Sequence, residues 1–131
     1  INTARVFDLE NQTPENRTLL SFDYSTGDMF SGLLRFNYYG DWSTTAGLFD
    51  NPADDPLIDV YDYGDNVLVD LEARFTFGER YQFTIGGENI FDTLPDTEQD
   101  PTSLFLGVRP SLTSPFGVNG AFWYARASVD F

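Results

Sequence analysis

The sequence predicts an all-β protein built as an antiparallel up-and-down sheet, and three observations predict this class. Apolar and polar residues alternate with period two over several segments of roughly ten residues, which is the length of a strand that crosses a membrane. Short turns and long connections alternate between these segments. As a weaker third signal, aromatic residues make up 17 % of the chain, and several lie near the ends of the predicted strands.

The clearest alternation lies in the predicted strand at residues 120–131. One face is apolar throughout, with Ala121, Trp123, Ala125, Ala127, Val129 and Phe131. The opposite face becomes more polar toward the end of the chain, with Phe122, Tyr124, Arg126, Ser128 and Asp130. A final Phe behind an apolar stripe is unusual in water and natural where the stripe faces lipid.

Four further strands are predicted at residues 17–24, 30–42, 66–77 and 81–91. In residues 66–77 the apolar face comprises Val67, Val69, Leu71, Ala73, Phe75 and Phe77. The polar face comprises Leu68, Asp70, Glu72, Arg74 and Thr76. A soluble β-sandwich alternates as cleanly, so the period alone leaves a soluble sheet and a transmembrane sheet both open.

The connections between the strands favour the transmembrane sheet. Residues 25–28 and 78–80 read as tight turns, whereas residues 43–65 and 92–119 are long connections. Outer-membrane barrels alternate short and long connections in this way, while compact soluble domains rarely carry two structureless loops of more than about 15 residues. The fold class is therefore predicted as an up-and-down transmembrane β-barrel. Five strands cannot close such a barrel, because the smallest natural barrels use about eight.

Four passages resemble TonB-dependent outer-membrane receptors. Residues 85–92 read Ile-Gly-Gly-Glu-Asn-Ile-Phe-Asp, followed by Pro95, and residues 114–120 read Ser-Pro-Phe-Gly-Val-Asn-Gly. Both are similar to passages near the end of these receptors. Residues 13–17 and 34–42 are similar to the approach loop and strand pair that precede them. Ala121 departs from the resemblance, since family members commonly carry Arg at this place.

The resemblance implies that residues 1–131 are the C-terminal part of a receptor barrel and supply about its last five strands, with no plug domain. It implies energised uptake of a scarce ligand across the outer membrane of a Gram-negative bacterium. The implied partners are the rest of the same barrel and its plug, TonB through a part outside this sequence, outer-membrane lipid and lipopolysaccharide. Residues 1–16, 43–65 and 92–119 would then be outer loops. Trp123, Ala125, Ala127, Val129 and Phe131 resemble the C-terminal signal read by the barrel-assembly machinery.

Composition restricts the other partners. The chain has 7 basic and 21 acidic residues and a net charge of −14, which argues against binding nucleic acid. Many of the acids fall in the predicted outer loops. One interpretation is a solvated acidic rim; another is a calcium site, because carboxylate oxygens suit hard cations. The candidate ligands for calcium are Asp50, Asp54, Asp55 and Asp59. No other cofactor is expected.

No enzymatic activity is expected. The chain has no His and no Cys, so it cannot hold a Ser–His–Asp triad or a Cys–His pair. The carboxylates predicted on the polar strand face are expected to form ion pairs with arginines of that face. Loop aromatics, including Tyr61, Tyr63, Phe105 and Phe116, either pack the loops together or stack on a ligand, whose identity stays open. The alternative functions are a passive porin-like barrel and a secreted acidic β-sandwich that binds sugars.

Overall fold

The computed structural model describes residues 3–45, 59–78 and 80–130. These residues form two compact units. The first unit comprises residues 1–17, 39–66 and 94–119, and the second comprises residues 18–38, 67–93 and 120–131. Most of the described secondary structure is antiparallel β-sheet, so the all-β class is confirmed.

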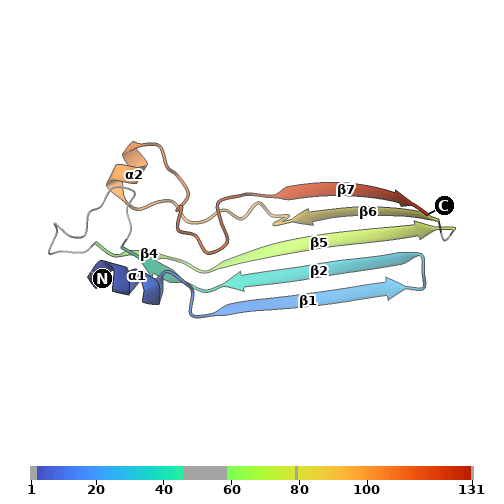
Figure 1. Cartoon of the computed structure of the whole chain (residues 1–131), viewed down its shortest axis with the longest axis horizontal. Coiled ribbons are helices and arrows are strands. Elements are labelled where there is room, and N and C mark those ends of the chain that lie inside the picture. Colours follow the sequence, from blue (N-terminus) through green and yellow to red (C-terminus); the bar gives the residue numbers. More distant parts are fainter. Residues whose placement is uncertain (1–2, 46–58, 79, 131) are drawn as a thin grey trace. The chain divides into compact units, whose positions relative to one another are not determined.

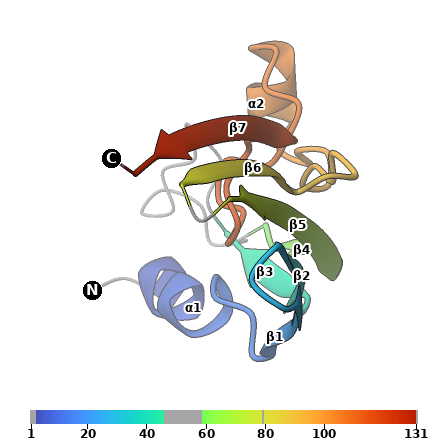
Figure 2. The ribbon, with the colours of Figure 1, turned by 90° about the vertical axis from the view of Figure 1, so that its right-hand side faces the viewer.

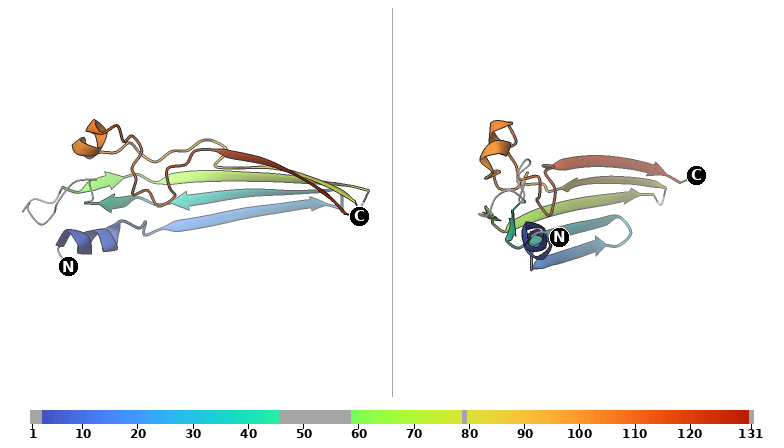
Figure 3. Two further views of the ribbon diagram at one scale, coloured as in Figure 1. Left: turned by 45° about the horizontal axis from the view of Figure 1, so that its top comes forward. Right: turned by 60° about the vertical axis from the view of Figure 1, so that its left-hand side comes forward.

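A five-stranded sheet dominates the second unit. Its strands are β1 (Arg17–Thr26), β2 (Phe30–Tyr39), β5 (Asn66–Phe77), β6 (Tyr81–Glu88) and β7 (Phe122–Val129), in the order β1-β2-β5-β6-β7. The arrows alternate in direction from each strand to the next (Figure 1), and the right-hand view of Figure 3 shows the same order. These long strands therefore form an up-and-down meander, in which each one pairs with the long strand that follows it along the chain.

The sheet is twisted and does not close on itself. Figure 2 views the strands nearly end-on and shows β5, β6 and β7 fanning successively, as the right-handed twist of strands requires. Strands β1 and β7 are its two edges. Among the described residues, no further strand pairs with either edge.

Three of these strands are shorter than the alternation predicts, and one of them, β7, spans Phe122–Val129 of the predicted residues 120–131. Strand β2 ends at Tyr39, although the predicted strand ran to residue 42, and the Gly40 amide donates instead to the Asn16 carbonyl at 2.8 Å. Strand β6 ends at Glu88 rather than at residue 91, because Asn89 adopts a left-handed backbone with φ 50°. Asn is one of the few residues that tolerate this conformation, and it breaks the strand.

The first unit has regular structure, most of it within the segments predicted as outer loops. Its elements are α1 (Thr3–Asn11), β3 (Trp42–Thr44), β4 (Tyr61–Tyr63) and α2 (Pro101–Phe105). Strands β3 and β4 pair antiparallel, with Trp42 opposite Tyr63. The two rings stack with their centroids 4.2 Å apart, and both side chains are buried, at 4 % and 3 % exposure. This stack is the apolar centre of the first unit.

Helix α1 is joined to this centre through Asp8, whose side chain is buried. One carboxylate oxygen of Asp8 accepts hydrogen bonds from the Thr45 amide at 2.7 Å and from the Thr45 hydroxyl at 2.8 Å. The Thr44 hydroxyl donates to the same oxygen at 3.3 Å. The buried carboxyl group of Asp8 is thereby hydrogen-bonded, as burial of a polar group requires.

Candidate functional site

The second unit separates apolar and polar side chains onto the two faces of its sheet, in register across the strands. On one face, Phe75 pairs with Phe83 and Phe83 pairs with Ala127. The next row on that face joins Ala73, Ile85 and Ala125. Because side chains alternate along each strand, matching registers give one continuous apolar face.

Aromatic contacts extend this apolar face to the other edge of the sheet. Phe30 of β2 lies 5.1 Å from Phe75 of β5, measured between ring centroids. Phe22 of β1 contacts Phe36 of β2 edge-on at 6.3 Å. Much of the face is exposed, including Leu20, Phe22, Tyr24, Leu71, Phe77, Tyr81, Phe83, Ile85, Trp123 and Val129. Val69, which was predicted on this exposed face, is buried at 7 %, and its carbonyl accepts from the Ile90 amide at the end of β6.

The opposite face carries a hydrogen-bonded polar network. Asp70 of β5 accepts from the Asn37 side chain at 2.9 Å and lies 3.7 Å from the Arg35 guanidinium, both on β2. Two residues along β5, Glu72 forms an ion pair with Arg74 at 3.1 Å. The sequence predicted ion pairs among these acids and arginines, and the structure contains these two. Both lie at a partly exposed surface, where ion pairs contribute little to stability.

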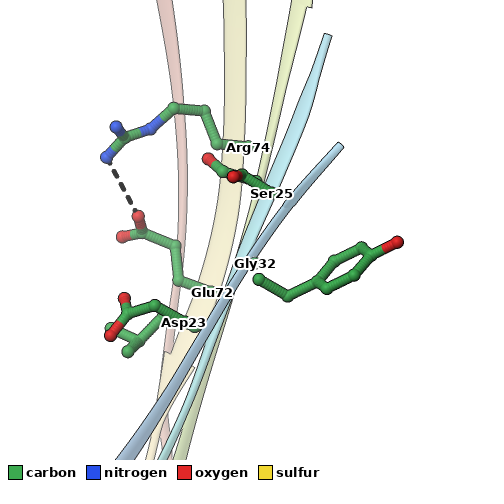
Figure 4. A pocket seen from close by; sticks show the side chains of 8 residues that line it. Asp23, Ser25, Gly32, Glu72 and Arg74 are labelled. Carbon is green, nitrogen blue, oxygen red and sulfur yellow. Dashed lines mark hydrogen bonds and ion pairs between the residues drawn. The ribbon is translucent and has the colours of Figure 1, made fainter. Parts of the chain in front are cut away.

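A polar hollow lies on this face beside Glu72. It is lined by Asp23, Tyr24, Ser25, Ser31, Gly32, Leu33, Glu72 and Arg74. Figure 4 shows Asp23, Glu72 and Arg74 directed to the same side, with the Arg74–Glu72 pair as a dashed line. Both carboxylate oxygens of Glu72 have partners: one pairs with Arg74, and the other accepts a hydrogen bond from the Tyr124 hydroxyl at 2.6 Å. The hollow is therefore a water-accessible, mixed-charge surface.

Residues 85–93, which include the first passage of the family resemblance, tie three strands together where β6 ends. The Asn89 amide donates to the Asp70 carboxylate of β5 at 2.9 Å. The Asn89 side chain bonds both backbone groups of Thr93, accepting from its N–H at 2.9 Å and donating to its carbonyl at 2.8 Å. Asp92 accepts from the Ala121 amide, just before β7, at 2.8 Å. Asn89 and Asp92 therefore act as structural residues that shape the turn.

In the first unit, a buried polar cluster forms around Glu98. One Glu98 oxygen accepts from the Tyr63 hydroxyl at 2.7 Å and from the backbone amides of Gln99 and Asp100 at 2.9 and 3.2 Å. Burial raises the pKa of the Tyr63 hydroxyl to about 12; a hydrogen bond with Ser111 opposes this rise and the Glu98 carboxylate reinforces it. Tyr63 thus stays a neutral donor to a buried acceptor.

Asp100 begins helix α2 as its N-cap. Its carboxylate accepts from the Ser103 amide at 2.6 Å and the Thr102 amide at 3.3 Å, and Pro101 occupies the first turn. Burial on its own would raise the pKa of Asp100, but the bonds from Ser103 and Thr102 hold it below its usual 3.8. The sequence reasoning missed this cap, although the Asp100-Pro101 pair is a recognised helix start.

Two of the predicted loop aromatics, Tyr63 and Phe116, pack within the first unit, whereas Phe49 lies outside the described residues. Tyr63 stacks on Trp42, and Phe116 contacts Tyr39 with 5.3 Å between ring centroids. Phe105 differs, since its side chain is 89 % exposed at the end of α2. Packing therefore accounts for Tyr63 and Phe116.

The predicted calcium ligands are only partly described. Asp50, Asp54 and Asp55 lie outside the described residues, and Asp59 is exposed. Within residues 3–45, 59–78 and 80–130, no three acidic side chains come together as a metal-binding group. The calcium site stays a prediction that rests on the sequence.

The residues predicted as an assembly signal lie on β7, apart from Phe131, which is outside the described residues. Trp123, Ala125, Ala127 and Val129 pair in register with Gly87, Ile85, Phe83 and Tyr81 of β6. They contribute to the continuous apolar face. Their role in assembly stays a prediction.

Comparison of the chain with protein families, with curated proteins and with solved structures found no match. Neither helix in the described part of the chain is long and apolar enough to cross a membrane. The features of the chain that bear on its function are the two faces of the sheet, the edges of the sheet and the sequence passages.

Proposed function

We propose that this chain is the C-terminal part of the transmembrane β-barrel of a TonB-dependent receptor in the outer membrane of a Gram-negative bacterium. The receptor takes up a scarce ligand, and energy reaches it through TonB and a plug domain, both outside these residues. The observation that carries the proposal is the continuous exposed apolar face of the five-stranded sheet. It belongs to a meander whose opposite face holds Asp70, Glu72 and Arg74.

Lipid is the surrounding that best fits the apolar face. Soluble monomers rarely expose a contiguous apolar patch larger than a few hundred Å². In outer-membrane barrels, long strands turn apolar side chains toward hydrocarbon and polar side chains toward the lumen. Strands β1, β2, β5, β6 and β7 have 10, 10, 12, 8 and 8 residues, close to the roughly 9–11 residues that cross a bilayer at a tilt. A covering protein layer is the alternative surrounding.

The two edges of the sheet support a barrel completed by further strands. Edge strands of soluble sheets usually carry Lys, Pro or bulges that prevent pairing. Neither β1 nor β7 contains Pro, and Lys is absent from the whole sequence; the charged residues of these strands are Arg17 and Asp23 of β1 and Arg126 of β7. In hydrocarbon each unpaired backbone group costs several kcal/mol, so both edges need neighbouring strands.

The two tryptophans of the chain allow a direct test of the lipid contact. Trp123 is 58 % exposed on the apolar face, whereas Trp42 is buried in the first unit. Full-length proteins that contain this chain, each keeping only Trp42 or only Trp123 and carrying Phe at every other tryptophan, are reconstituted in vesicles whose acyl chains carry bromine. Emission from Trp123 should fall at least about twofold, because bromine quenches at contact, while emission from Trp42 stays constant. Protein recovered in solution without detergent, with neither tryptophan quenched, would support the secreted sandwich instead.

A second experiment separates an energised receptor from a passive porin. The full-length protein that contains this chain is purified in detergent and mixed with the periplasmic domain of TonB. A receptor should bind that domain, and removal of the residues that precede the barrel should abolish binding. A barrel that inserts into membranes and conducts small solutes without binding TonB would establish the porin-like alternative.

A further inference from the structure

Two adjacent glycines of β6 have large aromatic side chains of β7 lying directly over them. A Cβ atom added at Gly86 would lie 2.5 Å from Cζ of Tyr124, and one added at Gly87 would lie 2.8 Å from Cε3 of Trp123. Real Cβ contacts are essentially never shorter than 3.0 Å. Since successive residues point to opposite faces, Tyr124 occupies the hollow on the polar face and Trp123 the hollow on the apolar face.

The Tyr124 side chain of β7 extends across β6 to Glu72 of β5, over the space that Gly86 leaves open. Gly86 pairs with Tyr124 on one side and with Glu72 of β5 on the other. The Tyr124 hydroxyl donates to a Glu72 carboxylate oxygen at 2.6 Å, passing over Gly86. The second oxygen of Glu72 is held by Arg74 at 3.1 Å. A side chain on β6 at this register position would force the Tyr124 ring to shift, and so displace its hydroxyl from Glu72.

Hydrophobic alternation cannot by itself fix the register of β7 against β6. A slip of one residue would exchange the two faces and is strongly disfavoured. A slip of two residues leaves every side chain on the same face, because each of Trp123, Ala125, Ala127 and Val129 then takes the place of the next apolar residue in the series. After such a slip, Tyr124 would lie opposite Thr84 or Glu88, where a side chain fills the space that Gly86 leaves open.

We propose that Gly86 and Gly87 form a docking slot in β6 that accepts the Trp123-Tyr124 pair of β7 and so selects one register among those that the alternation permits. The Tyr124–Glu72 hydrogen bond then joins β7 to β5 across the slot. Cross-strand shielding of glycine by an aromatic ring is a known way of pinning register. The slot goes beyond the proposed receptor function, because it acts whether lipid or protein covers the apolar face.

The register can be measured by disulfide cross-linking, since the chain has no native cysteine. Gln82 pairs with Ser128 in the observed register, so the pair Gln82→Cys and Ser128→Cys reports it. The pairs Gln82→Cys with Arg126→Cys, and Thr84→Cys with Ser128→Cys, report slips of two residues. Directly opposed strand residues are close enough for a disulfide, and residues two positions out of register are not. The unaltered protein should cross-link through the first pair at least about tenfold more than through the others.

The slot is then tested by substitution in the full chain. Gly86→Ala should lower the ratio of native to slipped cross-links at least about fivefold, or lower the yield of folded protein. Gly32→Ala is the matched control, because a Cβ there meets its nearest atom at an ordinary 3.5 Å. It should leave both the ratio and the yield unchanged. A Gly86→Ala protein with native yield and with its cross-link ratio within twofold of the original would overturn the proposal.

A double substitution keeps the test decisive if Gly86→Ala does not fold. Tyr124→Ala removes the ring that the added methyl group would strike. The protein with both changes should therefore match Tyr124→Ala alone in yield and in cross-link ratio, while Gly86→Ala alone is worse. If Gly86→Ala costs as much with Ala at position 124 as with Tyr, its effect does not pass through the ring and the slot is refuted. Tyr124→Phe should keep the native register, because it retains the ring and loses only the bond to Glu72.

Discussion

The two compact units differ in where their paired aromatic side chains and their carboxylates lie, although both expose apolar side chains, which in the first unit include Leu9, Phe105 and Leu112. In the first unit, the aromatic pair Trp42 and Tyr63 is buried, and the carboxylates of Asp8, Glu98 and Asp100 are buried with hydrogen bonds. In the second unit, large apolar side chains are exposed along all five strands, and Val69 is the one buried apolar residue of its described part. The first unit thus buries its aromatic pair, whereas the second unit exposes the aromatic side chains of its apolar face to the surroundings.

This difference indicates that the two units are adapted to different surroundings. Water favours burial of apolar surface, and the first unit meets that condition around Trp42 and Tyr63. The exposed face of the second unit would be unfavourable in water and favourable against hydrocarbon or another protein. Substitutions in one unit, each with a matched control, therefore test whether the two units have different surroundings.

The largest effect is expected for Trp42→Ala. Removal of a buried Trp from a packed site costs about 3–5 kcal/mol. The loss should appear as a lower free energy of opening of the β3 amides, Trp42–Thr44, measured by hydrogen exchange. Trp123→Ala is the matched change in the second unit and should leave those amides unaffected. If both substitutions lower the opening free energy of β3 equally, the two units are not separate structures.

The contact of the apolar face with lipid is tested by Leu71→Arg, which places a charge near the middle of β5 on that face. In lipid the substitution should cost about 2–4 kcal/mol, whereas Thr76→Arg on the polar face should cost clearly less. The measurement is the fraction of folded, heat-modifiable protein recovered in membranes. Leu71 is 43 % exposed, so in water its substitution would be tolerated. Equal recovery of the two proteins would therefore contradict a lipid-facing side.

The sheet of the second unit was predictable because its two faces differ in chemistry along every strand. Strand β5 spans Asn66–Phe77, matching the predicted residues 66–77. The ends were less predictable, since they depend on contacts between distant residues. The Gly40 amide bonds Asn16, and the Asn89 amide bonds Asp70. Neither pair has a period or spacing that sequence alone would indicate.

Most of the first unit was predicted as loops, because β3, β4 and α2 are too short to carry a period; Trp42 was predicted as the end of a strand, and the 9-residue helix α1 was missed. Strands β3 and β4 have three residues each. Their pairing depends on the Trp42–Tyr63 stack, between residues more than 20 positions apart. The Tyr63–Glu98 hydrogen bond joins residues 35 positions apart. Only the start of α2 at Asp100-Pro101 carried a local signal, and that signal reflects the chemistry of helix capping.

A smaller effect is expected for Asp100→Ala, which removes the cap of α2. Loss of an N-cap carboxylate costs about 0.5–2 kcal/mol. The expected result is faster proteolysis within residues 101–107, with the second unit intact. Asp100→Asn retains an acceptor oxygen and should restore most of the protection at neutral pH. Unchanged proteolysis in Asp100→Ala would show that the cap does not hold this segment in place.

The smallest effect at neutral pH is expected for Tyr63→Phe, about 1 kcal/mol, because the Glu98 oxygen keeps its two backbone donors. A larger difference should appear in alkali. The pKa of Tyr63 is about 12 in the folded chain, above the ordinary 10.0, so the folded state keeps its proton where the unfolded state loses it. Stability from this group is complete below pH 10 and is lost as the pH rises to 12.

Urea unfolding at several pH values measures this loss, followed by Trp42 fluorescence in proteins that carry Trp123→Phe. With Tyr63 present, the unfolding free energy of the first unit should fall more steeply between pH 10 and 12 than with Phe at this position. The Tyr63→Phe protein lacks the ionisable group and should show the shallower decline. Parallel declines in the two proteins would mean that the hydroxyl is not held neutral beside Glu98. The first unit would then lack the buried, hydrogen-bonded interior that distinguishes it from the second.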